Sequence, residues 1–183
     1  SGAGMALLYS TCTMVNSTVS GNSASLASGS DVDVSSAGGM FIKASSVVIR
    51  RSVISGNTAP TGGGLFIFSQ SSSTIPTTVE VRESTVSQNH AATNNGNEIC
   101  TFGTPTISIV NTLFNQATNA NDIYEVVGHA TWNTCATNNV CTDTPFTGGC
   151  AAVNNANTKY GVLCGCSTNS ATFLSTYGSK GVH

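Results

Sequence analysis

The stretch Arg50-Arg51-Ser52-Val53-Ile54-Ser55-Gly56-Asn57 is the clearest copy of a pattern that recurs along this chain. Three related segments occupy residues 15–22, 82–89 and 110–117, and a degenerate fifth copy occupies residues 132–139. Each of the first three copies places a Val or Ile three residues before an Asn. Repetition of this kind indicates a repeat architecture, in which each copy builds one unit of a stack.

A second motif precedes each copy and ends in an apolar residue. Its glycine-rich form is seen at Gly38-Gly39-Met40 and at Gly62-Gly63-Gly64-Leu65. The spacings between successive equivalent residues are 35, 25, 34 and 24, so the base period is 24–25 residues. Two units therefore carry insertions of about ten residues, which we expect to form Ser-rich surface loops at 25–36 and near 70–78. The equivalent apolar residues are Met5, Met40, Leu65, Ile99 and Ile123.

Hydrophobicity alternates with a period of two inside each unit, as in a half-buried β-strand. Together with the long period, this indicates a β-solenoid whose coils stack about 4.8 Å apart. We predict an all-β parallel β-helix of about five coils, with β-branched side chains in four inward stacks. The stacks are Met5, Met40, Leu65, Ile99 and Ile123; Leu7, Ile42 and Ile67; Met14, Ile49, Val81 and Ile109; and Val19, Ile54, Val86, Phe114 and Ala136.

The corners of the predicted coils have their own chemistry. Asparagines recur at one corner, although Ala117 interrupts the row. We expect them to adopt the left-handed backbone conformation and to bond their side-chain amides to the next coil. Glycines at the other corner would supply positive φ or allow close approach between coils. The corner asparagines are Asn22, Asn57, Asn89 and Asn139.

The two motifs together resemble the repeat of polymorphic outer membrane proteins, which occurs in surface autotransporter adhesins. The Gly-Gly part is matched by Gly38-Gly39-Met40 and Gly63-Gly64-Leu65. The Phe-x-x-Asn part is matched at residues 19–22, 54–57 and 86–89, with Val or Ile in place of Phe. The resemblance implies a right-handed parallel β-helix of the pectate-lyase-like type, exported to the cell surface, and it does not define a ligand.

The resemblance covers about residues 2–140 and leaves the Cys-rich tail outside. We therefore expect a β-helix at 1–141 and an irregular extension at 142–183 that packs on the helix or on a partner. Similar repeats occur in large extracellular proteins of algae and other protists. Because the chain begins inside a repeat motif, we expect it to be a mature product or a piece of a longer protein.

Composition favours a location outside the cytosol. Only 8% of residues are charged and the net charge is −2, which excludes strong attraction to nucleic acid or to an anionic membrane. Seven cysteines in a chain rich in Ser, Thr and Asn indicate disulfides in an oxidising compartment. A zinc site is the alternative, but no Cys-x-x-Cys occurs, and we expect neither metal nor cofactor. The disulfide candidates are Cys100, Cys135, Cys141, Cys150, Cys164 and Cys166.

Pectate-lyase-like helices also host polysaccharide lyases and hydrolases, so catalysis has to be considered. Glu98 and Asp122 align in adjacent coils, and carboxylates stacked about 5 Å apart suit a retaining glycosidase or a cation site. We favour the simpler interpretation that both acids replace turn glycines and remain solvated. Arg51 and Glu83 also align and are expected to form a salt bridge between coils.

An outward apolar stripe follows from the same alternation, and it presents more apolar surface than a protein leaves exposed to water. We expect it to be covered by the tail, with Cys100 bridged to a tail cysteine, or by another subunit. The open end of the first coil likewise predicts stacking on another chain or on further sequence. The candidate interface residues are Leu8, Phe41, Phe66, Phe68, Phe102 and Tyr124.

The main functional hypothesis is an extracellular structural or adhesive module that is not an enzyme. It would be a subunit or fragment of a larger surface assembly or filament, bound to copies of itself or to other surface subunits. The alternative is a carbohydrate-active or glycan-binding β-helix protein. Asn16-Ser17-Thr18 is an N-glycosylation sequon whose side chain is expected to point outward.

Overall fold

The structure is a computed structural model, and every regular element among the residues it describes is a β-strand. The strands pair in parallel within stacked sheets, which confirms the predicted all-β class. Within the described part of the chain, no helix is long and apolar enough to cross a membrane. The described residues are 4–25, 37–70, 73–92, 96–110, 112–115, 123–125, 130–132, 140–141 and 158–159.

Three large sheets contain nearly all of the strands. The first sheet contains, in spatial order, β1 (Met5–Leu8), β4 (Met40–Lys43), β8 (Leu65–Phe68), β12 (Ile99–Phe102) and β15 (Ile123–Glu125). The second contains β2 (Thr11–Val15), β5 (Ser46–Arg50), β9 (Thr78–Arg82), β13 (Thr106–Val110) and β16 (Thr131–Trp132). The third contains β3 (Thr18–Ser20), β6 (Val53–Ser55), β10 (Thr85–Ser87), β14 (Thr112–Asn115), β17 (Val140–Cys141) and β18 (Thr158–Lys159).

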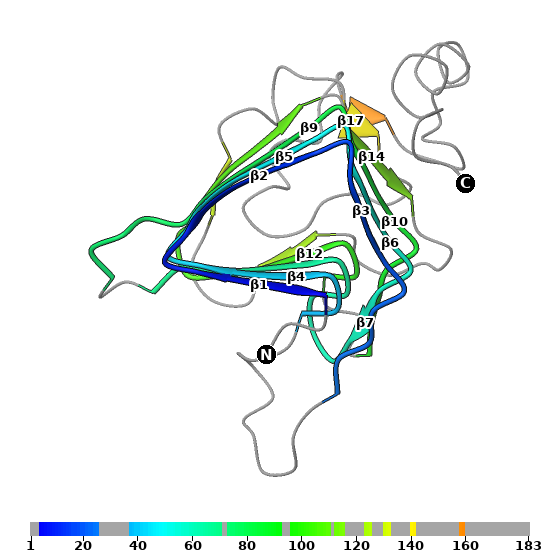
Figure 1. Cartoon of the computed structure of the whole chain (residues 1–183), viewed down its shortest axis with the longest axis horizontal. Helices are drawn as coiled ribbons and strands as arrows, with labels where there is room; N and C mark the ends of the chain where they lie inside the picture. Colours follow the sequence, from blue (N-terminus) through cyan, green and yellow to red (C-terminus); the bar gives the residue numbers. More distant parts are fainter. Residues whose placement is uncertain are drawn as a thin grey trace.

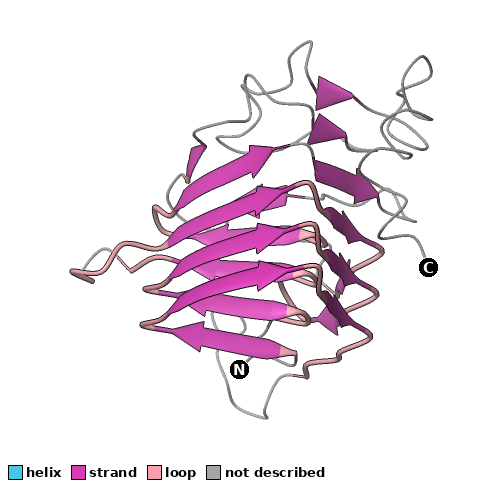
Figure 2. Ribbon diagram, turned by 45° about the horizontal axis from the view of Figure 1, so that its top comes forward, coloured by secondary structure: helices cyan, strands magenta, loops and turns pink. Residues whose placement is uncertain are grey.

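The sheets form the three sides of a triangle, with the interior between them (Figure 1). Equivalent strands lie one above another along the stack (Figure 2). We call each set of three consecutive strands, one from each large sheet, a coil. The first coil is β1, β2 and β3; the second is β4, β5 and β6; the third is β8, β9 and β10; and the fourth is β12, β13 and β14. A small sheet of β7 (Thr58–Ala59) and β11 (His90–Ala91) joins the second and third coils after their third strands.

The strand register confirms the repeat alignment over the first four coils. A shift of one residue would turn every inward side chain outward, so the apolar pattern permits one alignment of these strands. The second insertion is a loop between β8 and β9, as expected, whereas most of the first lies outside the described residues. The stacks found are Met5, Met40, Leu65, Ile99 and Ile123; Leu7, Ile42 and Ile67; Met14, Ile49, Val81 and Ile109; and Val19, Ile54 and Val86, with Phe114 next to Val86 by backbone pairing.

The degenerate fifth copy is wrongly aligned by the sequence. The prediction places Trp132 opposite Val110, but in the structure Trp132 pairs with Ile107. Likewise, Leu113 pairs with Cys141, which lies later in the chain than the predicted partner. The segment lacks the Val/Ile-Ser-x-Asn pattern, so nothing in the sequence opposes a shifted register. The predicted members of this copy that lie outside the described residues are Ala136 and Asn139.

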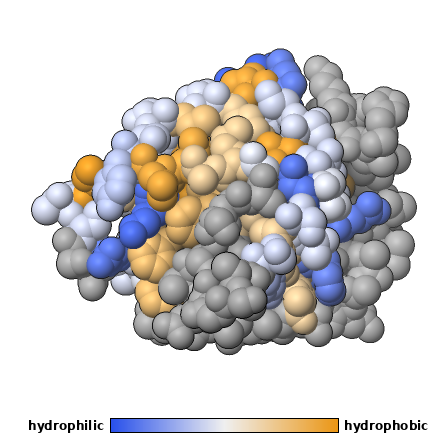
Figure 3. Space-filling view, turned by 60° about the horizontal axis from the view of Figure 1, so that its bottom comes forward, coloured by the Kyte–Doolittle hydropathy of each residue, from blue (hydrophilic) through white to orange (hydrophobic). Residues whose placement is uncertain are grey.

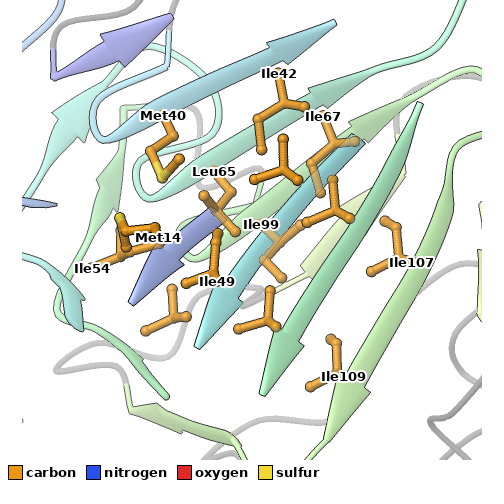
Figure 4. Packing of buried hydrophobic residues seen from close by; sticks show 14 of the residues in the cluster. Met14, Met40, Ile42, Ile49, Ile54, Leu65, Ile67, Ile99, Ile107 and Ile109 are labelled. Atoms are coloured by element: carbon orange, nitrogen blue, oxygen red, sulfur yellow. The ribbon is translucent and has the colours of Figure 1, made fainter. Parts of the chain in front are cut away.

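The inward side chains form one continuous apolar core along the stack, seen from close by in Figure 4. Ile42, Ile49 and Ile67 are fully buried, as are most of their neighbours above and below. Because each side chain meets its equivalents in the adjacent coils, similar branched side chains repeat at the same position. Stability therefore depends on contacts between neighbouring coils in addition to those within each coil.

Ile49 and Val48 provide a matched test of this arrangement. Ile49 is 0% exposed and faces the core, whereas Val48 in the same strand is partly exposed and faces outward. We expect Ile49→Ala to lower the free energy of unfolding by about 2–5 kcal/mol, because it opens a cavity between three coils. We expect Val48→Ala to cost less than about 1 kcal/mol. Urea denaturation of both variants measures the difference, and equal losses would contradict the assigned register.

Candidate interaction surfaces

Hydroxyl side chains connect the coils at the corner between the second and third sheets. The backbone N–H of Ser17 donates to Ser52 Oγ at 3.1 Å, and the N–H of Ser52 donates to Ser84 Oγ at 3.2 Å. Each hydroxyl in turn donates to a carbonyl oxygen two residues earlier, as Ser52 Oγ does to Arg50 O at 2.8 Å. The backbone N–H groups of these turns take no part in strand pairing, and the side-chain hydroxyls accept their hydrogen bonds instead.

The corner between the first and second sheets uses the same device. The N–H of Ser10 donates to Ser45 Oγ at 3.0 Å, and the N–H of Ala44 donates to Thr77 Oγ1 at 2.9 Å. These hydroxyl acceptors were not predicted from the sequence. A signal was present, because a Ser or Thr recurs at the same place in each copy of the repeat; these residues are Ser17, Ser52, Ser84 and Thr112.

Asparagines form a ladder at the third corner. The backbone N–H and the Nδ2 of Asn22 both donate to Asn57 Oδ1, at 3.0 and 2.9 Å. The same groups of Asn57 donate to Asn89 Oδ1, at 3.0 and 2.8 Å. The predicted amide bonding between coils is confirmed, but the predicted left-handed conformation of the asparagines is wrong. The preceding residue makes that turn, with a φ of 62° at Gly56, which leaves the Asn side chain free to point inward.

The ladder ends on Glu98. Its Oε2 accepts a hydrogen bond from Asn89 Nδ2, and its Oε1 accepts the Asn89 backbone N–H at 3.4 Å. Glu98 is 0% exposed, so the expectation of a solvated carboxylate is wrong. At Gly64, the equivalent position one coil earlier, a Cβ would lie 2.9 Å from Asn89 Nδ2. The side chain of Glu98 therefore points at the asparagine ladder. In the next copy of the repeat, Ala117 stands where the sequence would need another Asn, and the Glu98 carboxylate supplies the missing acceptor. Asp122, its predicted partner, lies outside the described residues.

The outward side chains of the first sheet form a second apolar cluster. Ala37, Phe41, Phe66 and Cys100 are buried together, apart from the core between the sheets. The rings of Phe41 and Phe66 stack with their centroids 5.8 Å apart. Phe41 is 9% exposed and Phe66 is 0% exposed, so these two members of the predicted apolar stripe are covered within the chain itself.

Turns of the same chain lie directly over this second cluster. A Cβ on Gly62 would lie 2.9 Å from Phe66 Cβ, and a Cβ on Gly96 would lie 2.7 Å from Cys100 Cβ. Glycine is needed at both positions, because each also has a positive φ. The period-two pattern predicts which side chains point outward from the coil, but it does not predict which turns of the chain cover them.

The margin of this face remains open. Leu8 is 48% exposed, and the partly exposed rings of Phe68 and Phe102 stack with centroids 4.9 Å apart. The Lys43 ammonium lies 5.0 Å from the centre of the Phe68 ring. Figure 3 brings this side of the molecule forward and shows apolar side chains between polar ones. Tyr124 pairs with Cys100 through its backbone, and its side chain is not described.

Cys100 is a free, buried cysteine in the structure, and the tail cysteines to which it was expected to bridge lie outside the described residues. Burial raises the pKa of its thiol well above the ordinary value. Cys12 is also free and is partly buried. Of Cys141 only the backbone in β17 is described. The other disulfide candidates lie outside the described residues; they are Cys135, Cys150, Cys164 and Cys166.

Charged side chains lie on the outer face of the second sheet and at its edge. Arg50 Nε lies 3.7 Å from Glu83 Oε2, and Arg82 pairs with Glu80. The predicted bridge between Arg51 and Glu83 is wrong, because Arg51 occupies an exposed turn with a φ of 48° and Glu83 pairs with the strand residue Arg50. In the described residues, no group of three or more His, Cys, Asp or Glu side chains could hold a metal ion.

A groove of about 410 Å³ lies at the corner between the first and second sheets. Tyr9, 65% exposed, and Ile75, 45% exposed, are among its lining residues. Ile75 belongs to the loop between β8 and β9, which protrudes from this corner (Figure 1). Thr78 Oγ1 and Ser46 Oγ, also in the lining, are 3.1 Å apart and hydrogen bonded. The groove therefore offers an aromatic ring and hydroxyl groups.

Asn16 of the sequon is exposed in the turn between β2 and β3, with a φ of 49°. Its side chain is therefore accessible from solvent, as the sequence predicts.

In comparisons with protein-family models, with curated proteins and with solved structures, the chain has no match.

Glu98→Gln tests whether the buried carboxylate has a structural role. The substitution keeps the size of the side chain but replaces one of the two oxygens that face the Asn89 N–H groups with a donor. We expect the free energy of unfolding to fall by about 1–3 kcal/mol. The control is Glu83→Gln, which removes a partly exposed ion pair and should cost less than about 1 kcal/mol. Equal effects in urea denaturation would contradict a role for Glu98 in the ladder.

Cysteine labelling tests the state of Cys100. We expect iodoacetamide to leave Cys100 unmodified in the native protein, because the thiol is buried and its high pKa keeps it protonated. After denaturation without reductant, Cys100 should be alkylated, as read by mass spectrometry of its peptide. Cys12 serves as the accessible reference. Labelling of Cys100 only after reduction would show that it forms a disulfide.

Proposed function

We propose that this chain is a structural and adhesive module of an extracellular assembly rather than an enzyme. In this proposal it is a right-handed parallel β-helix of about five coils followed by a Cys-rich extension. The observation that carries the proposal is the continuity of hydrogen bonds at all three corners. Neighbouring coils are joined at each corner by buried or half-buried side chains, in addition to the strand pairing.

Such corners suit a rigid spacer. Strand pairing fixes the spacing of the coils, and the corner bonds fix their rotation relative to one another. The strongest candidate for a reacting carboxylate, Glu98, is engaged with Asn89 inside the stack and is not open to a polymer substrate. The low charge and the composition rich in Ser, Thr and Asn support a position outside the cell.

Glycan binding is the second candidate function, and the corner groove is the observation that favours it. Tyr9 presents an exposed ring on which a sugar could stack, and Ser46 and Thr78 present hydroxyl groups beside it. Binding at this corner would be compatible with an adhesive role. Catalysis would need two accessible carboxylates around the bound sugar, and none of the described residues that line the groove carries a carboxylate.

The proposed function is tested by location and by the lack of catalysis. Immunogold labelling with antibodies to this chain should place it on the surface of the source cells. Incubation of the purified protein with a panel of neutral and acidic polysaccharides should release no reducing ends and no unsaturated uronides. Cleavage of any of these polysaccharides by the purified protein would overturn the proposal.

A glycan array separates the two candidates. If the groove binds glycans, Tyr9→Ala should abolish the binding and Val15→Ala should preserve it, because Val15 is exposed but lies away from the groove. Absence of binding by the unmodified protein would leave the purely structural function.

A further inference from the structure

The second sheet carries a column of hydroxyl side chains at the corner where the groove lies. The first residue of every strand in this sheet bears a hydroxyl group. Parallel pairing places these residues side by side from strand to strand along the stack (Figure 2). We call them the hydroxyl column; they are Thr11, Ser46, Thr78, Thr106 and Thr131.

The hydroxyl column points outward from the side of the stack. The next residues of β5, β9 and β13 are buried in the core, and successive side chains of a strand point to opposite faces. Ser46 is accordingly exposed, and Thr78 and Thr106 are partly exposed. Each of these three lies in a strand with a neighbour on both sides, so the column belongs to the flat face of the sheet. The buried residues that follow them are Val47, Val79 and Ile107.

The loop between β8 and β9 forms a wall beside this column. Thr77 Oγ1 donates to Phe68 O and accepts the N–H of Ala44, both at 2.9 Å, so the end of the loop is fixed to the corner. Ser73 Oγ accepts the N–H of Ile75 at 3.2 Å and donates to its carbonyl oxygen at 3.0 Å. These bonds hold Ile75 in the lining of the groove, where it gives the hydroxyl column an apolar side wall.

The groove carries no charge among the described residues that line it. On the same sheet, Arg50 and Arg82 lie at the far ends of their strands, and Glu80 lies in the next outward column. A nucleic acid or an acidic polysaccharide would need basic side chains along its path. The groove and the hydroxyl column therefore fit a neutral ligand.

The available hydrogen-bonding groups favour a sugar over a peptide. An extended peptide binds to the unpaired backbone of an edge strand, but β5, β9 and β13 are paired on both sides. The face offers side-chain hydroxyls instead, each of which can donate and accept. Thr78 Oγ1 and Ser46 Oγ are hydrogen bonded at 3.1 Å, so neighbouring members lie close enough to share one ligand group. Sugar hydroxyls match this chemistry, and the C–H face of a sugar ring can pack on the apolar wall.

The spacing of the column selects the shape of the polymer. Neighbouring strands lie about 4.8 Å apart, so a hydroxyl recurs at that interval along the stack. An extended β-1,4-linked polysaccharide advances by nearly the same distance with each sugar, whereas an α-1,4-linked glucan curls away from a straight line. One sugar of the extended chain can thus lie over each strand.

We propose that the hydroxyl column binds an extended, neutral, β-1,4-linked polysaccharide that lies parallel to the stack axis, with one sugar over each strand. The proposal rests on the glycan-binding function of the groove and deepens it by naming the class and direction of the ligand. The groove holds the sugars over Thr11, Ser46 and Thr78. Thr106 and Thr131 extend the track beyond the groove.

Thr106→Val tests the track, because it removes one hydroxyl of the column and keeps the shape of the side chain. The probes are cellotriose, which fills the groove, and cellohexaose, which reaches Thr106. Isothermal titration of the full chain should show that cellohexaose binds at least about ten-fold more tightly than cellotriose. The substitution should weaken the binding of cellohexaose about five-fold and leave that of cellotriose unchanged, because Thr106 does not line the groove.

Thr13→Val is the matched control. Thr13 is exposed on the same sheet but belongs to the next outward column, so the binding of both sugars should stay as in the unmodified protein. Thermal unfolding followed by circular dichroism verifies that both variants are folded. Equal losses in the two variants, or tighter binding of maltohexaose or of an oligogalacturonate, would overturn the proposal. So would the absence of binding by cellohexaose, mannohexaose and xylohexaose.

Equal affinity for cellotriose and cellohexaose would overturn the extended track while leaving glycan binding in the groove intact. None of these outcomes bears on cell-surface labelling or on the lack of polysaccharide cleavage. Failure of the track is therefore distinguishable from failure of the proposed function.

Discussion

The hydrogen bond from a corner N–H to a side-chain oxygen of the next coil is the constraint on which the rest of this structure depends. Strands satisfy their backbone by pairing, but at a corner the chain changes direction and a buried N–H needs another acceptor. Ser52 and Asn57 provide such acceptors for the first coil. Because these bonds join residues one repeat apart, they select the same register as the apolar core, in which Ile54 must face inward.

The ladder at the third corner tolerates a change of acceptor but retains its bonding pattern. Where Ala117 takes the place of the next asparagine, Glu98 reaches the ladder from a position that is glycine in the earlier coils. A buried carboxylate is unfavourable unless it is hydrogen bonded, and both of its oxygens accept from Asn89. Glu98, a candidate catalytic residue in the sequence, therefore has a structural position in the fold.

The molecule has two apolar clusters with different roles. The inner cluster holds the coils together, and the outer cluster of Phe41, Phe66 and Cys100 holds the turns against the first sheet. The outer cluster removes most of the aromatic surface that would otherwise invite a partner. Among the described residues, the rim of this face near Leu8 and Phe68 is only partly covered.

The sequence by itself determined the parallel stack, its inward columns and the asparagine ladder, because a repeat with period-two hydrophobicity permits one register of its strands. The register predicted from the sequence is wrong for the segment at Trp132, where the repeat motif is not retained. Tertiary structure alone decided that turns of the same chain cover Phe66 and Cys100 and that Glu98 points inward. Those outcomes depend on how turns fold over a sheet and on which side chain fills a gap one coil away. Such contacts join residues whose spacing leaves no periodic signal in the sequence.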